Sequence, residues 1–374
     1  MKQKYDMHIL HIIPGYGGGI SSFVKSLAKG NINSNAVYDV ISFTSYPKDF
    51  LEIIKNQHGN CYMLPNVYKH PLKMLYEYRK ILKKSNYNFI HCHISGYKGL
   101  VFKLLTPKAK KRIIMHAHHI GNDKIPFAYS PSIYISQLFS RLLSIKYLAC
   151  CQQAAQYVYG KNVLAQFMPN AIDTTQYLSP LPEDEQINYL SELNLTSKTK
   201  IIGHIGRFDI VKNHKFMLRI AQSLIKKDFK FTMIFVGDGA LKKEIENLAK
   251  EYGVSNHINF LGYRSDVYNL IKMFDIVLLP SLSEGLPITI IEAQAAGIPC
   301  IISDSISKEV DLGLGLVHFL PLTNLEIWTN KLIDDFSPQN TNIENRLQAL
   351  KVAGYTLEEM QKIYFKVLHE INDT

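Results

Sequence analysis

The sequence predicts an α/β protein with two doubly wound domains, each a parallel sheet covered by helices. Short apolar runs rich in β-branched residues alternate with longer amphipathic segments along the chain, a pattern typical of parallel strands joined by helices. The chain has 374 residues, and a usual domain size of about 150 residues favours two or three domains. In sheets of this kind ligands bind at the carboxyl ends of the strands.

The elements of the first half follow from this alternation. Strands are expected at residues 7–13, 36–43, 89–93 and 112–117, and helices at 20–29 and 72–84. The second half continues the pattern, with strands expected at 201–205, 232–236, 258–261, 276–279 and 300–303 and helices near 214–227, 241–252, 265–274 and 288–296. Residues 173–200 contain two prolines and an acidic run, and they are interpreted as the linker between domains plus a short helix.

Composition excludes several classes of protein. The chain is 47% hydrophobic and 20% charged, so a disordered, collagen-like or disulfide-stapled chain is not expected. The five cysteines are odd in number and form no CxxC pair, which favours a reducing compartment. The first apolar run is too short and polar for a signal peptide, and no uninterrupted apolar stretch of about 18 residues predicts a spanning helix. A cytoplasmic protein is therefore expected.

Charge is distributed unevenly between the two halves. Residues 1–180 hold 22 Lys and Arg against 7 Asp and Glu, a net +15, whereas residues 181–374 hold 20 against 25, a net −5. Basic surfaces attract nucleic acid, anionic lipid or phosphorylated ligands. Nucleic acid is disfavoured because neither a helix-turn-helix nor a zinc pattern is present.

The most informative stretch is residues 278–299, LLPSLSEGLPITIIEAQAAGIP. An apolar strand is followed by a polar loop that carries Glu284. A helix follows, with Pro287 in its first turn and Gly297 at its end. Glu292 lies in this helix among apolar neighbours, where a carboxylate needs a partner. The helix N-terminus can hold an anion, although both Glu side chains could instead have only structural contacts.

A second stretch, residues 201–214, reads IIGHIGRFDIVKNH. It predicts a strand that ends near Gly206, a loop with Arg207 and Lys212, and then a helix. Two cations at the mouth of a parallel sheet suit a diphosphate, since Arg offers a planar donor fork and Lys a point charge. Either residue alone would be read as surface charge.

The first predicted strand is followed by the glycine-rich loop PGYGGGI, residues 14–20, where a backbone can approach a ligand closely. The loop is neither a clean GxGxxG nor a P-loop, and Asp39 stands near the start of the second strand, so a nicotinamide site is disfavoured. Two later strands end in HCH (residues 91–93) and HAHH (residues 116–119). Each i, i+2 pair shares a face and could bind a metal, but no further cluster completes a site, so one His that hydrogen-bonds substrate is the favoured interpretation.

Taken together, these motifs resemble glycosyltransferase family 4, whose members have the GT-B fold. The resemblance rests on EGLPITIIE with its E-x7-E spacing (284–292), on R-x4-K (207–212), on VGDG (236–239), on PNAID (169–173), and on the glycine-rich and HAHH segments. It spans residues 7–304. It implies an N-terminal Rossmann-like acceptor domain, residues 1–172, and a C-terminal nucleotide-sugar domain, residues 173–355. A last helix, about 356–374, would pack back on the first domain.

The resemblance also implies a retaining transfer of a sugar from a nucleotide-diphosphate sugar, most commonly a UDP-sugar. Arg207 and Lys212 would hold the diphosphate and stabilise the leaving group, and Glu292 would accept hydrogen bonds from the ribose. Glu284, with the backbone of Gly285 and Leu286, would hold the transferred sugar and phosphate. His118 would lie near the reacting sugar, with His116 and His119 as competitors. The remaining binding residues implied are Gly18, Gly19, Gly237 and Arg264.

No DxD-type metal pair stands at the expected place, so a metal-independent enzyme without a cofactor is predicted; the two cations would neutralise the diphosphate. The basic first half, including Lys69, Lys73, Lys80, Lys83, Lys84 and the run 108–112 beside apolar residues of 72–82, favours two alternatives. The basic surface is either a solvated face or a peripheral contact with an anionic membrane. The expected acceptor of the transferred sugar is a glycan or a lipid-diphosphate-linked sugar. Abundant Lys, Asn and Ile favour a bacterial capsule or exopolysaccharide setting.

Two alternatives to transfer remain open. One is a UDP-sugar 2-epimerase of the same fold, which would bind UDP in a similar way but need no acceptor. The other is a catalytically idle partner subunit, against which the retained acidic, cationic and His residues argue.

Overall fold

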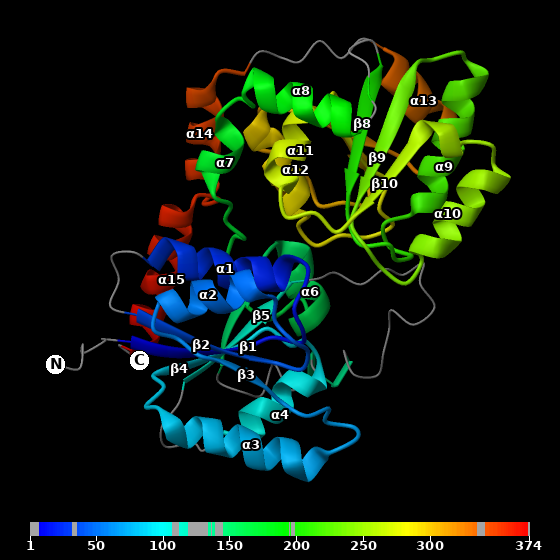
Figure 1. Cartoon of the computed structure of the whole chain (residues 1–374). Coiled ribbons are helices and arrows are strands. Elements are labelled where there is room, and N and C mark those ends of the chain that lie inside the picture. Colours follow the sequence, from blue (N-terminus) through cyan, green and yellow to red (C-terminus); the bar gives the residue numbers. More distant parts are fainter. Residues whose placement is uncertain are drawn as a thin grey trace. The chain divides into compact units, whose positions relative to one another are not determined.

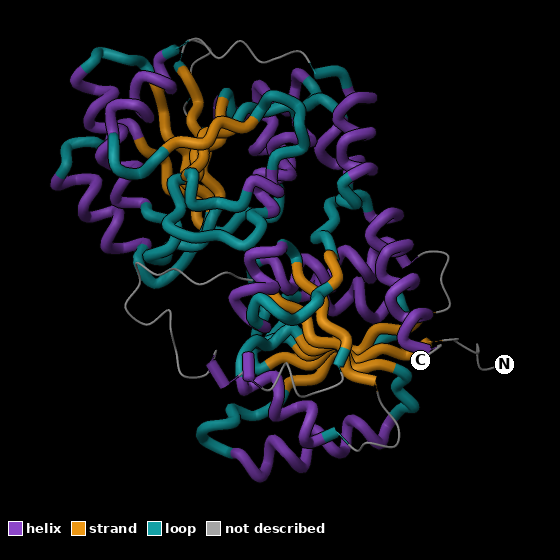
Figure 2. The backbone as a smooth tube through the Cα atoms, turned by 180° about the vertical axis from the view of Figure 1, so that it is seen from behind, coloured by secondary structure: helices purple, strands orange, loops and turns teal. Residues whose placement is uncertain are grey.

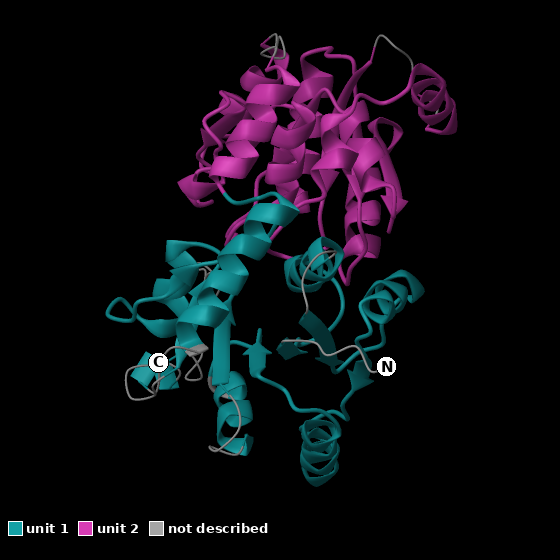
Figure 3. Ribbon diagram, turned by 90° about the vertical axis from the view of Figure 1, so that its left-hand side faces the viewer, with its two compact units in different colours: residues 1–171, 354–374 teal, residues 172–353 magenta. Residues whose placement is uncertain are grey.

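The computed structural model describes residues 7–31, 36–106, 112–118, 134–135, 137–138, 145–193, 195, 199–334 and 341–372. The chain divides into two compact units, residues 1–171 with 354–374 (unit 1) and residues 172–353 (unit 2). Figure 3 shows that the C-terminal segment belongs to unit 1 although it follows unit 2 in the sequence.

Unit 1 contains a seven-stranded sheet with parallel pairing in the order β3-β2-β1-β4-β5-β6-β7 (Figure 1). Its strands are β1 Met7–Ile12, β2 Ala36–Ser42, β3 Cys61–Met63, β4 Phe89–Cys92, β5 Arg112–Ala117, β6 Lys146–Ala149 and β7 Gln166–Phe167. Its described helices include α1 Gly19–Gly30, α2 Lys48–Asn56, α3 Pro71–Lys84, α4 Tyr97–Leu105, α6 Gln152–Tyr159 and α15 Leu357–Asn372.

The core of unit 1 lies between the sheet and helices from both ends of the chain. Helix α15 buries Met360, Tyr364, Val367 and Leu368 in the same cluster that holds Phe23 of α1. A buried apolar side chain contributes about 1.5–3 kcal/mol, so this helix is an integral part of unit 1.

Unit 2 contains a six-stranded parallel sheet in the order β10-β9-β8-β11-β12-β13. The strands are β8 Lys200–Ile205, β9 Phe231–Val236, β10 Ile258–Gly262, β11 Ile276–Leu279, β12 Cys300–Ser303 and β13 Val317–Leu320. The helices are α7 Thr174–Leu178, α8 Glu183–Glu192, α9 His214–Lys226, α10 Lys242–Glu251, α11 Val267–Met273, α12 Ile288–Ala296, α13 Leu325–Ile333 and α14 Ile343–Val352.

Both sheets are doubly wound, with helices on both faces (Figure 2). The strand order reverses between β1 and β4 in unit 1 and between β8 and β11 in unit 2. These are the topological switch points at which such sheets bind ligands. The predicted fold class, two Rossmann-like parallel-sheet domains, is confirmed.

Two local predictions are corrected. Residues 173–200 are not a linker with one short helix: α7 and α8 belong to unit 2, where they pack against α11, α12 and α14. Pro287 does not lie in the first turn of its helix but directly precedes it, with an extended ψ of 107°. In the part of the chain that the structure describes, no helix combines the length and the apolar character needed to cross a bilayer.

Candidate functional site

The loop between β11 and α12 forms the centre of the candidate site. Strand β11 is fully buried and ends at Leu279, and α12 starts at Ile288 after Pro287. Gly297 ends the helix in the left-handed conformation at φ 79°, which a glycine adopts without the penalty that a Cβ brings. The loop is therefore held between a buried strand and a well-defined helix start.

Glu284 of this loop is paired with Lys212 of the loop after β8. The Lys212 Nζ lies 2.6 Å from Glu284 Oε1, and both side chains are only 16% exposed. The hydroxyl of Ser281 donates to the same oxygen at 2.9 Å. The structure thus brings together the two residues that the sequence motifs singled out as the anion-binding and sugar-binding groups.

Backbone contacts hold the two loops side by side. The N–H of Leu282 donates to the carbonyl of Val211 at 2.8 Å. Asn213, in the left-handed region at φ 56°, donates from its side chain to the carbonyl of Pro280 at 3.1 Å. Asn tolerates this conformation better than most residues, which lets helix α9 begin at His214, two residues after Lys212.

Arg207 emerges from a backbone junction that requires glycine. The side chain of Arg207 is exposed, and within the described residues no carboxylate is paired with it. Gly237, at φ 138°, lies so close to the preceding strand end that an added Cβ would stand 2.0 Å from the carbonyl oxygen of Gly206. Gly237 therefore shapes the loop beneath Arg207 through its backbone.

Glu292 has the partner that its apolar surroundings demand. The hydroxyl of Tyr177 on α7 donates to Glu292 Oε1 at 2.7 Å. Burial raises the pKa of Glu292 to about 6, and the Tyr177 hydrogen bond opposes this by favouring the charged form. Tyr177 stands 115 positions away in the sequence, so no spacing motif points to it.

For the other predicted site residues of unit 2, the structure shows burial or ion pairs. Gly285 and Leu286 are buried and follow Glu284 immediately before α12. The Arg264 guanidinium donates to two carboxylates. Two of its nitrogens donate to Asp266 at 2.8 and 2.6 Å, and the third donates to Glu192. Arg264 is thus not presented as an unpaired cation.

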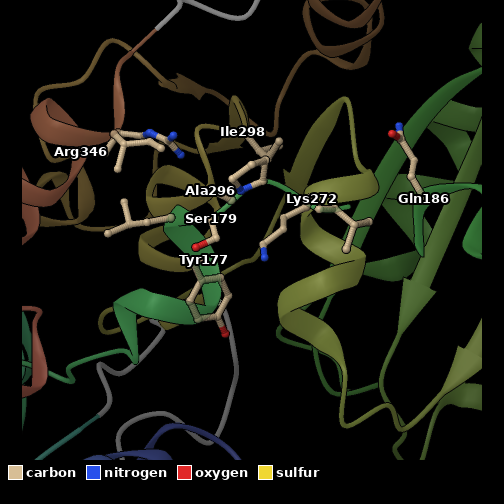
Figure 4. A pocket seen from close by; sticks show the side chains of 11 residues that line it. Tyr177, Ser179, Gln186, Lys272, Ala296, Ile298 and Arg346 are labelled. Atoms are coloured by element: carbon tan, nitrogen blue, oxygen red, sulfur yellow. The ribbon is translucent and has the colours of Figure 1, made fainter. Parts of the chain in front are cut away.

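Tyr177 also lines a pocket of about 320 Å³ in unit 2 (Figure 4). Its lining includes Lys272, Ala296 and Arg346, and Arg346 donates to the carbonyl of Ala295 at 2.6 Å, which caps the end of α12. None of the sequence-predicted site residues lines this pocket. Its lining residue Tyr177 is the one that donates to Glu292.

In unit 1 the glycine-rich loop leads directly into α1. Gly17 and Gly18 have φ values of 114° and 75°, and Gly19 is the first residue of the helix. The N–H of Gly17 donates to the hydroxyl of Ser21 at 2.9 Å, so the loop is folded back on its own helix. Asp39 is buried and accepts from the Tyr87 hydroxyl at 2.6 Å, a structural contact that leaves it unsuited to hold a ribose.

The histidines of unit 1 gather on one face of the sheet. His91 and His93 of the β4 end lie beside His116 and His118 of the β5 end, as the two-residue spacing predicted. His11 of β1 joins them, because the sheet order places β1 next to β4. His11 completes one three-histidine group with His91 and His93, and residues 93, 116 and 118 form a second group; the sequence analysis missed both. His119 lies outside the described residues.

The two units thus carry separate sets of predicted residues. Unit 2 joins Glu284 to Lys212, carries Arg207 in the same loop as Lys212 and carries Glu292 on α12, whereas unit 1 carries Gly18, Gly19 and His118. At the switch point unit 2 offers two cations, the Glu284 carboxylate and the start of α12, and Glu292 lies within that helix. This arrangement can bind a diphosphate joined to groups with several hydroxyls.

Comparison with known proteins shows similarity to glycosyltransferases. Residues 185–311 match the family model of the glycosyl transferases group 1. The chain is 28% identical over 363 residues to EpsF of Bacillus subtilis, whose name calls it a glycosyltransferase, covering 94% of this chain and 93% of that one. It is 25% identical over 243 residues to the Escherichia coli UDP-Gal:alpha-D-GlcNAc-diphosphoundecaprenol alpha-1,3-galactosyltransferase, covering 62% of each chain.

The fold is that of HepE from Anabaena, a protein solved in complex with UDP and glucose. The two structures align with a TM-score of 0.78 at 17% identity, over 97% of this chain and 100% of HepE. The family match and the curated relatives support a glycosyltransferase, and the structural likeness supports the GT-B-type pair of Rossmann-like units.

Proposed function

We propose that this chain is a retaining, metal-independent glycosyltransferase of family 4. It would move a sugar from a nucleotide-diphosphate sugar, a UDP-sugar, to a glycan or lipid-diphosphate-linked acceptor in the synthesis of bacterial capsule or exopolysaccharide. The observation that carries the proposal is the 2.6 Å contact between Lys212 and Glu284 at the switch point of unit 2, beside the exposed Arg207 and the start of α12.

In this proposal Arg207 and Lys212 neutralise the diphosphate as the bond to the sugar breaks. Positive groups fixed where negative charge develops lower the barrier most when little rearrangement is needed. Lys212 is already held by Glu284 and by the paired loops, so a bound phosphate would share it. Glu284, Gly285 and Leu286 would hold the sugar and phosphate at the start of α12, and Glu292 would accept from the ribose hydroxyls.

Unit 1 would supply His118 beside the reacting sugar and Gly18 and Gly19 to the diphosphate. Arg264 would lie near the base with its present carboxylate partners retained, and Gly237 would shape the loop under Arg207. Because two cations neutralise the diphosphate, no metal and no cofactor are required.

The acceptor would bind unit 1. A pocket of about 260 Å³ there is lined mostly by apolar side chains, with Lys98 among them. Pro14, Phe43 and Ile94 in its lining follow β1, β2 and β4, so the pocket lies at the ligand-binding edge of the sheet. An apolar pocket with one cation suits a lipid-linked phosphate, the acceptor class that the name of the E. coli relative gives.

The transfer itself is tested by product analysis. The chain is incubated with a panel of UDP-sugars and a sugar-diphosphate-lipid acceptor in excess chelator. The expected product is the acceptor with one added sugar, in the same anomeric configuration as the donor. An isomerised sugar nucleotide formed without acceptor would instead establish the 2-epimerase, and no reaction in any arm would favour the idle subunit. Activity lost in chelator and restored by Mn²⁺ would contradict metal independence.

We also propose that the chain associates peripherally with the inner face of the cell membrane, through α3. Leu72 and Tyr76 are 80% and 65% exposed and lie among Lys69, Lys73 and Lys80, which are exposed as well. Ile81 and Leu82, which the sequence analysis grouped with them, are buried in unit 1. Residues 108–111 of the basic run lie outside the described residues.

Vesicle binding tests this association. The chain should sediment with anionic vesicles at low salt, and binding should weaken as salt rises, because surface attraction is screened within about 10 Å at 0.1 M. Leu72→Ser with Tyr76→Ser should reduce binding several-fold. Met63→Ser, an equally exposed apolar residue on β3, is the matched control. Equal binding to neutral and anionic vesicles would rule out the electrostatic part of the proposal.

A further inference from the structure

The pocket of about 320 Å³ in unit 2 has no part in the proposed chemistry. Its walls come from α7 and the residues that follow it, from α8 and α11, from the end of α12 and from α14 (Figure 4). The volume lies at the small end of the range for ligand pockets. It suits a molecule the size of a phosphorylated monosaccharide.

The pocket and the proposed diphosphate loop lie at opposite ends of α12. The loop with Glu284 precedes Ile288, the first residue of the helix, whereas Ala296, its last residue, lines the pocket. A helix of nine residues is about 13 Å long. A ligand in the pocket therefore leaves the diphosphate loop open, and the two are separate sites.

The charge of the pocket is positive. Among its described lining residues two are cations and none is acidic, although the second half of the chain has an excess of acidic residues. Figure 4 shows Lys272 of α11 and Arg346 of α14 extending into the pocket from opposite walls. Burial lowers the pKa of both groups, and only Glu185 opposes this at Lys272. Positive charge that is not balanced by nearby acids attracts anions.

Arg346 is held in place with most of its donors unused. It is only 9% exposed; its Nη1 donates to the carbonyl of Ala295 at 2.6 Å, and its Nε is buried without a hydrogen-bond partner. Gly297 keeps this place open, because an added Cβ there would stand 3.1 Å from Nη1. A guanidinium has five N–H donors in a fixed fork. A buried guanidinium with one bond to the described residues is therefore positioned in advance to bind an anion.

Lys272 and two uncharged side chains complete the polar lining. The Lys272 amine lies 6.0 Å from the centre of the Tyr268 ring, at the outer limit of a cation–π contact. No hydrogen bond to a described residue competes for its three donors. Ser179 and Gln186 are exposed and also line the pocket. The cations suit a phosphate, and the hydroxyl and amide suit the hydroxyls of a sugar.

Tyr177 links the pocket to Glu292. Its ring lines the pocket and its hydroxyl donates to Glu292 Oε1 at 2.7 Å. Figure 4 shows this hydroxyl directed away from Lys272 and Arg346. Ser179 directly follows the last residue of α7. A ligand that bonds Ser179 and packs on the Tyr177 ring therefore contacts the α7 segment at two points, and it holds α7 where the hydroxyl reaches Glu292.

We propose that this pocket is a regulatory site for a small phosphorylated metabolite, whose phosphate is bound by Arg346 and Lys272. Occupancy fixes Tyr177 on Glu292 and thereby strengthens binding of the nucleotide sugar. The site itself stands on the geometry of unit 2 alone. Its coupling to the donor rests on the proposed function, which places Glu292 at the ribose.

Calorimetric titration of the full chain with mannose 6-phosphate, inorganic phosphate and mannose tests the site. The hexose phosphate should bind most tightly, inorganic phosphate more weakly and mannose not detectably. Lys272→Gln and Arg346→Gln should each weaken hexose phosphate binding about tenfold. Lys272→Gln breaks no hydrogen bond to a described residue, so its fold should be intact. Lys351→Gln, which removes an exposed cation of α14 outside the pocket, should bind like wild type.

Three results would overturn the site. The first is no binding of either phosphate at millimolar concentration. The second is wild-type affinity in Lys272→Gln with loss of affinity in Lys212→Met, because the phosphate would then occupy the diphosphate loop. The third is equal affinity for inorganic phosphate and the hexose phosphate, which would contradict an occupant of sugar size.

Titration of UDP-glucose with and without saturating mannose 6-phosphate tests the coupling. The Kd of UDP-glucose should fall about fivefold, and by reciprocity UDP-glucose should lower the Kd of the hexose phosphate by the same factor. Tyr177→Phe keeps the ring in the pocket wall and removes the hydroxyl, so it should bind the hexose phosphate but show no coupling. Unchanged or weakened UDP-glucose binding in wild type, or coupling retained in Tyr177→Phe, would contradict the link.

The outcomes separate the two proposals. Hexose phosphate binding in a chain with no affinity for UDP-glucose would contradict the proposed function and leave the site standing. Sugar transfer by a chain that binds no hexose phosphate would do the reverse.

Discussion

Replacing Lys212 by Met is expected to lower kcat by about 10²–10³-fold in the transfer assay. The amine lies 2.6 Å from Glu284 Oε1 in a setting only 16% exposed, where fixed charge acts through a lower effective dielectric than water. Loss of one group that stabilises developing charge costs this much in well-studied enzymes. Steady-state kinetics with a UDP-sugar donor measures it.

Loss of Lys212 also leaves Glu284 without its cation, which destabilises the loop. Lys212→Arg keeps the charge and the ion pair. It should retain more activity than Lys212→Met when both variants are assayed at a temperature at which both are folded. Lys215→Met is the matched control, because Lys215 is also paired with a carboxylate, Glu244 at 2.7 Å, but is 57% exposed. If Lys212→Met kept wild-type kcat, the cationic loop would not act on the leaving group.

Glu292→Gln is expected to weaken binding of a UDP-sugar by about 30-fold at pH 8, because hydrogen bonds to a charged acceptor contribute about 2 kcal/mol. Wild-type affinity should fall as pH drops through about 6, where the carboxylate takes up a proton. The Gln variant should show no such limb. Calorimetric titration from pH 5 to 8 measures both.

Tyr177→Phe sharpens this test. The Tyr177 hydroxyl donates to Glu292 and favours its charged form, so its removal raises the pKa of Glu292 further and should move the acid limb to higher pH. An unmoved limb would assign the pH dependence to another group.

Stability should change in the opposite direction to binding. The folded-state pKa of Glu292 is raised above the ordinary value of 4.5 to about 6, so folding favours its protonated form. That favourable contribution is complete below pH 4.5 and is lost as pH rises through 6, which costs about 2 kcal/mol above pH 6 by linkage. Glu292→Gln should therefore melt at a higher temperature than wild type at pH 8, a pattern typical of residues kept for function.

Much of the fold could be predicted from the sequence because its central strands are continuous buried runs. The bounds of β11, β12 and α12 agree with the expectation residue for residue. Strands β3, β6, β7 and β13 were missed. Strands β3, β7 and β13 are two to four residues long with exposed or half-exposed side chains, so neither length nor hydrophobic period distinguishes them from loops. Strand β6 is mostly buried but only four residues long, which is too short to show a hydrophobic period. Helices α7 and α8 were read as linker because prolines and an acidic run stand at their borders.

The candidate site, too, could be predicted from the sequence only in part. Motif spacing predicted that Glu284 and Lys212 share a function, since the carboxyl ends of neighbouring strands meet at one edge. It could not predict the partner of Glu292, because Tyr177 lies on a short helix with no motif of its own. Nor could it place His11 beside His93, because that contact depends on β1 pairing with β4 across 82 positions.

The central claim is that the Lys212 and Glu284 loops of unit 2 bind the diphosphate of a nucleotide sugar. Calorimetric titration of the full chain with UDP-glucose, UDP and uridine tests it most directly. The account predicts that the two diphosphates bind and uridine does not, and that Lys212→Met loses most of the difference while Lys215→Met keeps it. Uridine binding as tightly as UDP, or diphosphate affinity unchanged in Lys212→Met, would contradict it.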